Sequence, residues 1–505
     1  SLLSVVTTFG FDTCGNVNSV SIVGKDKNGV AMPARTTTSS FGTRCAFPES
    51  VTNALAQTST SAYNYSYGVK SSTTDPNGVG VSFGYDSFAR RTSEYRPDGT
   101  STTWTYEDCT TASCWGLIDN LRLRVTERLY SSAAVLVRSG EKFFDALERS
   151  KYEGSQRVLG TWTYTKTVYN ALGLKYELFQ PYSSGHNGFH RYAYDELNRP
   201  TSDQLYNASG ALDRTTGMAY AGLKTTFTDA KNNVTHKWTD VTGKLRKITD
   251  PSPGGTTEHT FDAFGNLVKM KDAGAVETTY TYNLRGFKTG SSDPDTGSWT
   301  YTPNSLNELV EQTDAKAQLT RFDYDKLGRM ISRTEPEYPS TPTTWTYGTS
   351  AAAHNIGRLQ SLAQPDGYQE GYTFDSLGRP AVSTYTMDGT AYAVDTTYNT
   401  LGAVDTLKYP TSSSGYRFTL KYVYSYGFVQ QVKDNAAGTI FWSLSDANDY
   451  GSPKTEVLGN TATISSTYTP WTNDLTSRQV VKGSTLQSLA YQWDLNGNLQ
   501  QRQDL

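Results

Sequence analysis

Histidine, a common metal ligand and catalytic base, is scarce in this chain, with five copies in 505 residues. His186 and His190 stand four residues apart, which is the spacing of two zinc ligands on one face of a helix. Gly188 lies between them in a turn-rich segment that follows Pro181, and no Glu follows His186 as it does in zinc metalloproteases. We therefore expect no helix here, and neither a metal ion nor another cofactor.

Paired carboxylates could supply the acid and the base of a glycosidase. Four aspartates recur in one sequence context, each directly after an aromatic residue: Asp262, Asp325, Asp375 and Asp494. An Asp at the start of a turn accepts hydrogen bonds from downstream backbone amides, so turn capping is the interpretation we favour. The sequence contains no Gly-x-Ser-x-Gly elbow, P-loop, Rossmann fingerprint or dense Asp-x-Asp-x-Asp run. We expect no catalytic residue and no enzymatic activity.

The four cysteines, Cys14, Cys45, Cys109 and Cys114, all lie in the first quarter of the chain. Cys109 and Cys114 flank a four-residue loop that suits a disulfide if the chain turns there. Free structural thiols are an alternative. Half of a zinc site is a third interpretation, but no second cysteine pair of zinc-finger spacing follows. A disulfide would favour an oxidising compartment.

The aspartates belong to a repeat with the pattern aromatic, Asp, two free positions, Gly, and then Arg or Asn. The clear copies are Tyr324-Asp325-Lys326-Leu327-Gly328-Arg329, Phe261-Asp262-Ala263-Phe264-Gly265-Asn266, Phe374-Asp375-Ser376-Leu377-Gly378-Arg379 and Trp493-Asp494-Leu495-Asn496-Gly497-Asn498. Degenerate copies begin at Phe11, Tyr85, Phe144, Tyr169, Tyr194, Tyr282 and Tyr398, some with Ala89, Glu148 or Asn198 in place of Gly, and a decayed copy lies near residues 354–358. Phe144, Tyr169 and Tyr194 are 25 residues apart, whereas Phe261 and Tyr282 are 21 apart. Such a period is typical of a repeat protein.

Each repeat has the pattern of a β-hairpin. Rings alternate with small polar residues before the Asp, as in Tyr280-Thr281-Tyr282, which places successive rings on one face of a strand. The Asp can bond its own downstream backbone, and the Gly supplies a left-handed conformation without Cβ strain. A second strand such as residues 329–334 follows, and then a turn such as Pro97-Asp98-Gly99. Two strands and two turns fill the unit, and we interpret the helix-like run 141–149 as another copy of the first turn.

The tripeptide Trp-Thr-Tyr recurs at residues 104–106, 162–164, 299–301 and 345–347. We interpret it as an alternating strand with both large rings on the packed face. The alternative is an exposed aromatic ladder that stacks on sugar rings. The face that carries the rings would distinguish the two.

Composition excludes several classes of partner. The net charge is -3, from 46 basic and 49 acidic residues, and no run of five like charges occurs, so nothing indicates nucleic acid. No stretch of 18 apolar residues could span a membrane. The mean hydropathy of -0.56 would suggest disorder, but 12% of the residues are aromatic, which favours a folded chain.

These observations predict an all-β fold. A single hairpin is only marginally stable, so the units must pair edge to edge into one long antiparallel sheet. A strongly twisted sheet of that length cannot stay flat, and we expect it to coil into a hollow shell or spiral.

The repeat resembles the YD repeat of the RHS family, which includes bacterial RHS toxins, shell components of insecticidal toxin complexes, and teneurins. The resemblance is clearest in residues 141–505, which we expect to form the repeat array, whereas residues 1–140 are an irregular, degenerate part of it. It implies a β-sheet cocoon around a C-terminal toxin. The sequence has no Asp-Pro-x-Gly-Leu motif, which closes the repeats in that family, and no variable C-terminal domain. We therefore expect a fragment of the wall, open at both ends.

The favoured function is a structural shell that encapsulates or scaffolds a toxin or other secreted cargo. The alternative is an extracellular adhesion or carbohydrate-binding array, and an enzyme with an unrecognised carboxylate site is a distant third. The expected partners are the remainder of the same polypeptide or an encapsulated toxin domain, with self-association through open sheet edges. The expected location is secreted or at the cell surface.

Overall fold

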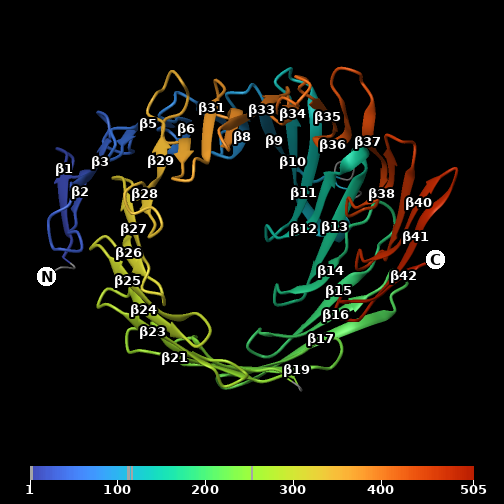
Figure 1. The fold of residues 1–505 in the computed structure, drawn as a ribbon. Coiled ribbons are helices and arrows are strands. Elements are labelled where there is room, and N and C mark those ends of the chain that lie inside the picture. Colours follow the sequence, from blue (N-terminus) through green and yellow to red (C-terminus); the bar gives the residue numbers. More distant parts are fainter. Residues whose placement is uncertain (1–3, 111–113, 115–117, 252–253) are drawn as a thin grey trace. The chain divides into compact units, whose positions relative to one another are not determined.

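The computed structural model describes residues 4–110, 114, 118–251 and 254–505. In this part of the chain the regular structure consists of 42 β-strands and two short 3-10 turns, η1 (Ile118–Asn120) and η2 (Val158–Gly160). Figure 1 shows the strands as arrows coloured along the chain, many of them labelled. Among the described residues, no helix is long and apolar enough to cross a membrane.

The strands of the first half of the chain are β1 (Val6–Phe11), β2 (Val17–Val23), β3 (Arg35–Ser40), β4 (Ser50–Thr52), β5 (Thr58–Asn64), β6 (Val69–Thr74), β7 (Gly80–Tyr85), β8 (Arg91–Tyr95), β9 (Ser101–Asp108), β10 (Leu121–Tyr130), β11 (Leu136–Asp145), β12 (Ser150–Gln156), β13 (Trp162–Tyr169), β14 (Lys175–Phe179), β15 (Phe189–Tyr194), β16 (Pro200–Tyr206), β17 (Leu212–Ala221), β18 (Lys224–Thr228), β19 (Val234–Thr239) and β20 (Leu245–Thr249). Those of the second half are β21 (Thr256–Phe261), β22 (Leu267–Lys271), β23 (Glu277–Tyr282), β24 (Lys288–Asp293), β25 (Gly297–Pro303), β26 (Leu309–Thr313), β27 (Leu319–Tyr324), β28 (Met330–Thr334), β29 (Thr343–Tyr347), β30 (Leu359–Ala363), β31 (Gln369–Phe374), β32 (Pro380–Met387), β33 (Thr390–Tyr398), β34 (Val404–Lys408), β35 (Thr419–Ser425), β36 (Phe428–Asp434), β37 (Ile440–Ala447), β38 (Pro453–Leu458), β39 (Thr463–Tyr468), β40 (Leu475–Lys482), β41 (Ser484–Trp493) and β42 (Leu499–Asp504).

Consecutive strands pair antiparallel. For example, Tyr192 of β15 lies opposite Asp203 of β16, and Asp203 lies opposite Thr216 of β17. The described strands belong to one sheet of 42 strands. The expected all-β fold, one long antiparallel sheet of hairpins, is confirmed, and the run 141–149 forms the end of β11 and a turn rather than a helix.

The alternation expected from the sequence is visible in β23. Tyr280 and Tyr282 are half-buried on one face, whereas Thr279 and Thr281 are exposed on the other. Because side chains alternate between faces in a strand, this pattern holds the strand in one orientation in the sheet.

One compact hydrophobic cluster joins β10, β11 and β12 to the loop after β9; its members Leu121, Phe143, Tyr152 and Cys114 are at most 5% exposed. Tyr164 packs against this cluster, with its ring over Gly154. A Cβ on Gly154 would lie 2.3 Å from Cε1 of Tyr164, so only glycine leaves room for the ring.

The structure pairs Cys109 with Cys114 in a disulfide across the loop beside this cluster, with 5.3 Å between the two Cα atoms. The central loop residues 111–113 lie outside the described part of the chain. A second disulfide joins Cys14 to Cys45, a pair that sequence analysis did not single out.

The chain divides into two compact units. Unit 1 comprises residues 1–97, 255–396 and 409–417, and unit 2 comprises residues 98–254, 397–408 and 418–505. Each unit therefore packs a segment from the first half of the chain against a segment from the second half. The sequence separated residues 1–140 from 141–505 by the regularity of their repeats. The two compact units are defined by packing instead, so they do not test that boundary.

Candidate functional site

The repeated turn is the element that sequence analysis singled out, and Asp325 illustrates its geometry. The amide of Asp325 donates to the carbonyl of Arg329 (2.9 Å), and the amide of Gly328 donates to the carbonyl of Asp325 (3.0 Å). Oδ1 of Asp325 accepts from the amides of Leu327 (2.8 Å) and Arg329 (3.0 Å). Gly328 has a φ of 77°, and the strand register shifts by one residue at Tyr324. This is a tight turn closed by a β-bulge whose left-handed position favours Gly.

The residue after the Gly completes the turn. Nε of Arg329 donates to Oδ2 of Asp325 at 2.8 Å, so the carboxylate binds both backbone and guanidinium. Partial burial opposes ionisation of Asp325, but the hydrogen bonds from Arg329 and Leu327 outweigh it and hold the pKa of Asp325 below its usual value. The expected capping role of this Asp is what the geometry displays.

The other expected copies have the same turn. Asp262, Asp375 and Asp494 each accept from the amides two and four residues downstream. Their downstream glycines, Gly265, Gly378 and Gly497, have φ values of 71–85°. Arg379 pairs with Asp375, whereas the side-chain amides of Asn266 and Asn498 donate to Asp262 and Asp494.

Degenerate copies keep this conformation at a residue with a side chain. Ala89, Glu148 and Asn198 have φ values of 57–61°. The turn also recurs within residues 1–140, for instance at Asp12 and Asp86. The turn geometry therefore extends into the part of the chain where the sequence pattern is irregular.

The aromatic residue of the motif contacts the preceding repeat, which sequence analysis did not anticipate. The hydroxyl of Tyr324 donates to the carbonyl of Leu309 at 2.8 Å, and Leu309 directly follows the previous turn of this kind. The same bond to a carbonyl 15–20 residues upstream is made by Tyr85, Tyr169, Tyr194, Tyr220, Tyr424 and Tyr468. Each of these tyrosines therefore ties one turn to the next.

The arginine of one turn also stacks on the aromatic ring of a following strand. The guanidinium carbons of Arg149, Arg199 and Arg329 lie 4.7, 4.2 and 3.9 Å from the ring centroids of Tyr169, Tyr220 and Tyr347. A guanidinium that already binds a carboxylate covers the ring and attracts its electrons. The only signal of this Arg–ring stacking in the sequence is that an Arg recurs some 20 residues before a Tyr.

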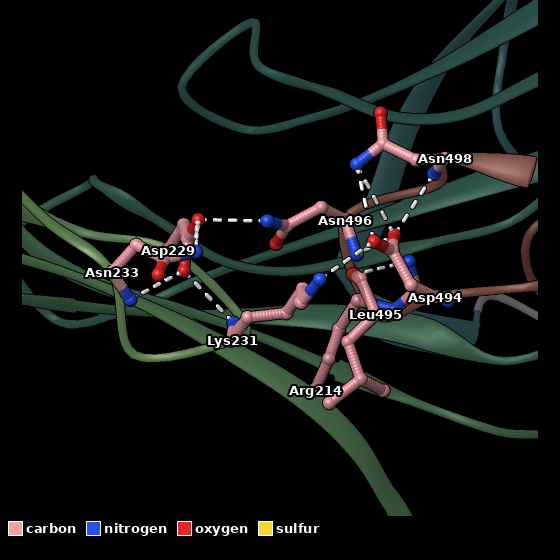
Figure 2. Close-up of polar contacts among 8 residues, drawn as sticks. All are labelled: Arg214, Asp229, Lys231, Asn233, Asp494, Leu495, Asn496 and Asn498. Atoms are coloured by element: carbon pink, nitrogen blue, oxygen red, sulfur yellow. Dashed lines mark hydrogen bonds and ion pairs between the residues drawn. The ribbon is translucent and has the colours of Figure 1, made fainter. Parts of the chain in front are cut away.

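Turns far apart in the sequence bind one another in unit 2, as Figure 2 shows for the turns at 229–233 and 494–498. Nζ of Lys231 lies 3.1 Å from Oδ2 of Asp494, and Nδ2 of Asn496 donates to Oδ2 of Asp229 at 2.7 Å. Each turn thus binds the carboxylate of the other with its third residue. The guanidinium of Arg214 adds a bond to the carbonyl of Leu495 at 2.8 Å.

Unit 1 contains an equivalent contact. The amide of Ser305, in the turn at 304–308, donates to the carbonyl of Lys25 at 2.8 Å, and Arg35 pairs with Glu308. Leu306, the third residue of this turn, packs against Gly24. A Cβ on Gly24 would lie 2.7 Å from Cγ of Leu306, so a glycine is needed there.

The aromatic tripeptides do not share one face throughout. In β13, Tyr164 shares the face of Phe143 and the buried cluster, as expected. In β9, Trp104 lies opposite Glu127, which lies opposite Gly140, so its ring is on the other face. There Trp104 borders a groove of about 440 Å³ with Glu127, Glu153 and Arg157.

The histidine pair lies in β15 and the loop before it. The ring of His186 packs edge-on against Phe179, and Nδ1 of His190 lies 2.6 Å from Oδ1 of Asp203. Within the described ranges, no group of three or more His, Cys, Asp or Glu side chains is arranged to hold a metal ion.

Comparison with known proteins places the fold. No protein-family model and no curated protein matches the sequence. Among solved structures, a crystal structure of TcdB2-TccC3 matches 99% of this chain with a TM-score of 0.80 at 13% identity. The Tc holotoxin pore of Photorhabdus luminescens matches 99% with a TM-score of 0.78 at 14% identity.

The chain spans 31% and 32% of the lengths of these two solved chains. The resemblance to RHS-type shell proteins is thereby confirmed at the level of the fold.

The left-handed position yields a paired prediction. Gly328→Val should lower the free energy of unfolding by ~1–3 kcal/mol, because a β-branched residue is strained at positive φ. Glu148→Gly should raise it by about 0.5–1 kcal/mol, because it removes a Cβ from the same conformation. Glu148→Ala is the control, since it keeps the Cβ. Chemical denaturation measures all three, and a Glu148→Gly protein no more stable than Glu148→Ala would contradict the role of the backbone.

The tyrosine hydroxyl can be tested in both directions. Tyr324→Phe should lower the free energy of unfolding by about 0.5–1.5 kcal/mol through loss of the bond to Leu309. Phe374 holds the equivalent position, and the carbonyl 15 residues upstream belongs to Leu359, so Phe374→Tyr should stabilise the protein. The contact is unimportant if neither substitution moves the denaturation midpoint.

The turn carboxylates predict acid sensitivity. The hydroxyl of Thr242, then the amides of Lys244 and Thr242 and the guanidinium of Arg246, lower the pKa of Asp240 from 3.8 to about 2. A lowered folded-state pKa stabilises the protein above the unfolded pKa, so this contribution should disappear as the pH falls from about 4 to about 2. Asp240→Asn keeps an acceptor for the amides, as Asn283 does in its own turn, but does not titrate.

The parent protein should therefore exceed Asp240→Asn in urea midpoint at pH 6, and the difference should shrink towards pH 2. A difference that is constant with pH would show that the carboxylate charge is not involved.

Proposed function

We propose that the chain is a segment of the wall of a secreted, non-enzymatic shell that encloses a toxin or other polypeptide cargo. The observation that carries the proposal is the match of 99% of the chain to TcdB2-TccC3 at a TM-score of 0.80. The fold is shared, whereas cargo and location are inferred.

The repeated turn supports a structural role. Every motif residue is engaged within the wall: the Asp binds the turn, the Arg binds the Asp and the next ring, and the Tyr binds the preceding repeat. Repeats that use their recurring side chains on their neighbours are built for extension, as in other repeat proteins. The recurring carboxylates are therefore the wrong groups for acid and base catalysis.

A carbohydrate-binding array is the second candidate, and the groove at Trp104 favours it. An indole beside Glu127, Glu153 and Arg157 combines a ring surface with polar groups, as sugar sites do. The indole already donates to Oε2 of Glu127 at 3.1 Å, and Trp104 is the one aromatic residue among the described residues that line the groove, so no aromatic ladder is present there. We therefore rank this function below the shell.

Protease protection tests the shell. The protein purified from its natural source should carry a second polypeptide or domain that resists protease while the wall is folded. After the wall is unfolded in urea, the same polypeptide should be cleaved, which is the internal control. Absence of any protected polypeptide would refute encapsulation, and binding to a glycan array that Trp104→Ala abolishes would favour the second candidate.

A further inference from the structure

One edge of unit 2 carries a row of exposed apolar side chains at the tips of its turns. The turns at 145–149, 170–174 and 195–199 join β11 to β12, β13 to β14, and β15 to β16. Leu147, Leu172 and Leu197 occupy the third position of these turns and are 71%, 73% and 71% exposed. We call this the outer YD edge; the turn at 240–244 continues it with Val241, which is 89% exposed.

The three leucines form a regular row. Turns on alternate connections lie two strands apart, which is about 10 Å, so the three side chains span about 20 Å. A regular row of exposed apolar side chains is a candidate interaction surface, because an apolar partner would remove them from water.

The same kind of turn is covered elsewhere in the chain. In unit 2, the amide of Ser132 donates to the carbonyl of Thr400 at 2.8 Å, and Leu401, the third residue of its turn, is half-buried in a groove with Ala133 and Val135. In unit 1, Ser305 is 1% exposed. The covered turns at 399–403 and 304–308 therefore bond through their second residue and half-bury their third, whereas the covered turn at 494–498 bonds through its third residue, Asn496.

Each strand has a repeat turn at one end and a connecting turn at its other end. In each case the element that covers a repeat turn is a connecting turn. The turns at 131–135 and 229–233 lie at the other ends of the strands that form the outer YD edge, and they cover the turns at 399–403 and 494–498. In the part of unit 2 that the structure describes, this pattern leaves two edges uncovered: the outer YD edge, and the turns at 434–439, 458–462 and 482–484, which we call the outer opposite edge.

These two edges lie at opposite ends of the stacked strands, since every strand has one turn at each end. They cannot meet within one unit. The outer opposite edge exposes Ala436, Ala437 and Lys482, whereas the outer YD edge exposes Glu148 and Glu196 beside its leucines. Both edges carry charges of both signs, so the complementarity is one of size: the small tips of one edge leave room for the apolar tips of the other, as Ala133 does for Leu401 in the groove at 399–403.

We propose that the outer YD edge binds the outer opposite edge of a second copy of this chain. The copies associate head to tail, through the turn-on-turn contact that already joins 131–135 to 399–403. Such an interface is heterologous, so each copy keeps one free edge for a further copy.

Two charge variants test the proposal. Variant 1 carries Leu147→Glu, Leu172→Glu and Leu197→Glu on the outer YD edge; variant 2 carries Ala436→Glu and Ala437→Glu on the outer opposite edge. All five positions are exposed, so the melting temperature and far-UV circular dichroism should match the parent. Phe9→Glu, at a 53% exposed position of β1 outside the turns, is the matched control.

Sedimentation velocity should show concentration-dependent association of the parent and of Phe9→Glu, with a dissociation constant at least tenfold weaker in either variant alone. A mixture of variants 1 and 2 has one intact edge of each kind and should form a dimer that grows no further. The proposal fails if the parent remains monomeric at every concentration, if the variants associate as the parent does, or if the mixture forms no dimer.

Discussion

The rest of the structure depends on the residue with positive φ that closes each repeated turn, such as Gly328. It allows the bulge that returns the chain into the next strand, and the Asp holds that bulge through two backbone amides. A shift of one residue would move every ring to the other face of the sheet. Only with this register do the hydroxyl of Tyr324 and the carbonyl of Leu309 meet.

The turns and strands could be predicted from the sequence because their signals are local. Asp, Gly and alternating rings act within six residues, and Asp325 and Gly328 behave as that spacing requires. Where Gly is replaced, as at Glu148, the neighbouring hydrogen bonds still impose the conformation. The degenerate copies therefore retain the shape after the pattern in the sequence has weakened.

The contacts between distant turns could not be predicted, because they use positions that are free in the motif. Lys231 and Asn496 have no common pattern, and their importance depends on which turn lies opposite. Cys14 and Cys45 are likewise 31 residues apart with no local signal. Trp104 and Trp162 stand in identical tripeptides, but the register of β9 and β13 puts them on opposite faces.

The long spacing of the turn-on-turn contacts sets a delay during synthesis. Each hairpin can form as soon as its own residues have emerged, but the turn at 229–233 must wait for partners 263 residues later. At a synthesis rate of roughly 5–20 residues per second, that wait is about 13–50 s. During this time Lys231 lacks its partner Asp494, and the nascent sheet is held by contacts within its own windings: hydrogen-bonded ladders, Tyr–carbonyl bonds, Arg–ring stacks and the hydrophobic cluster at Phe143.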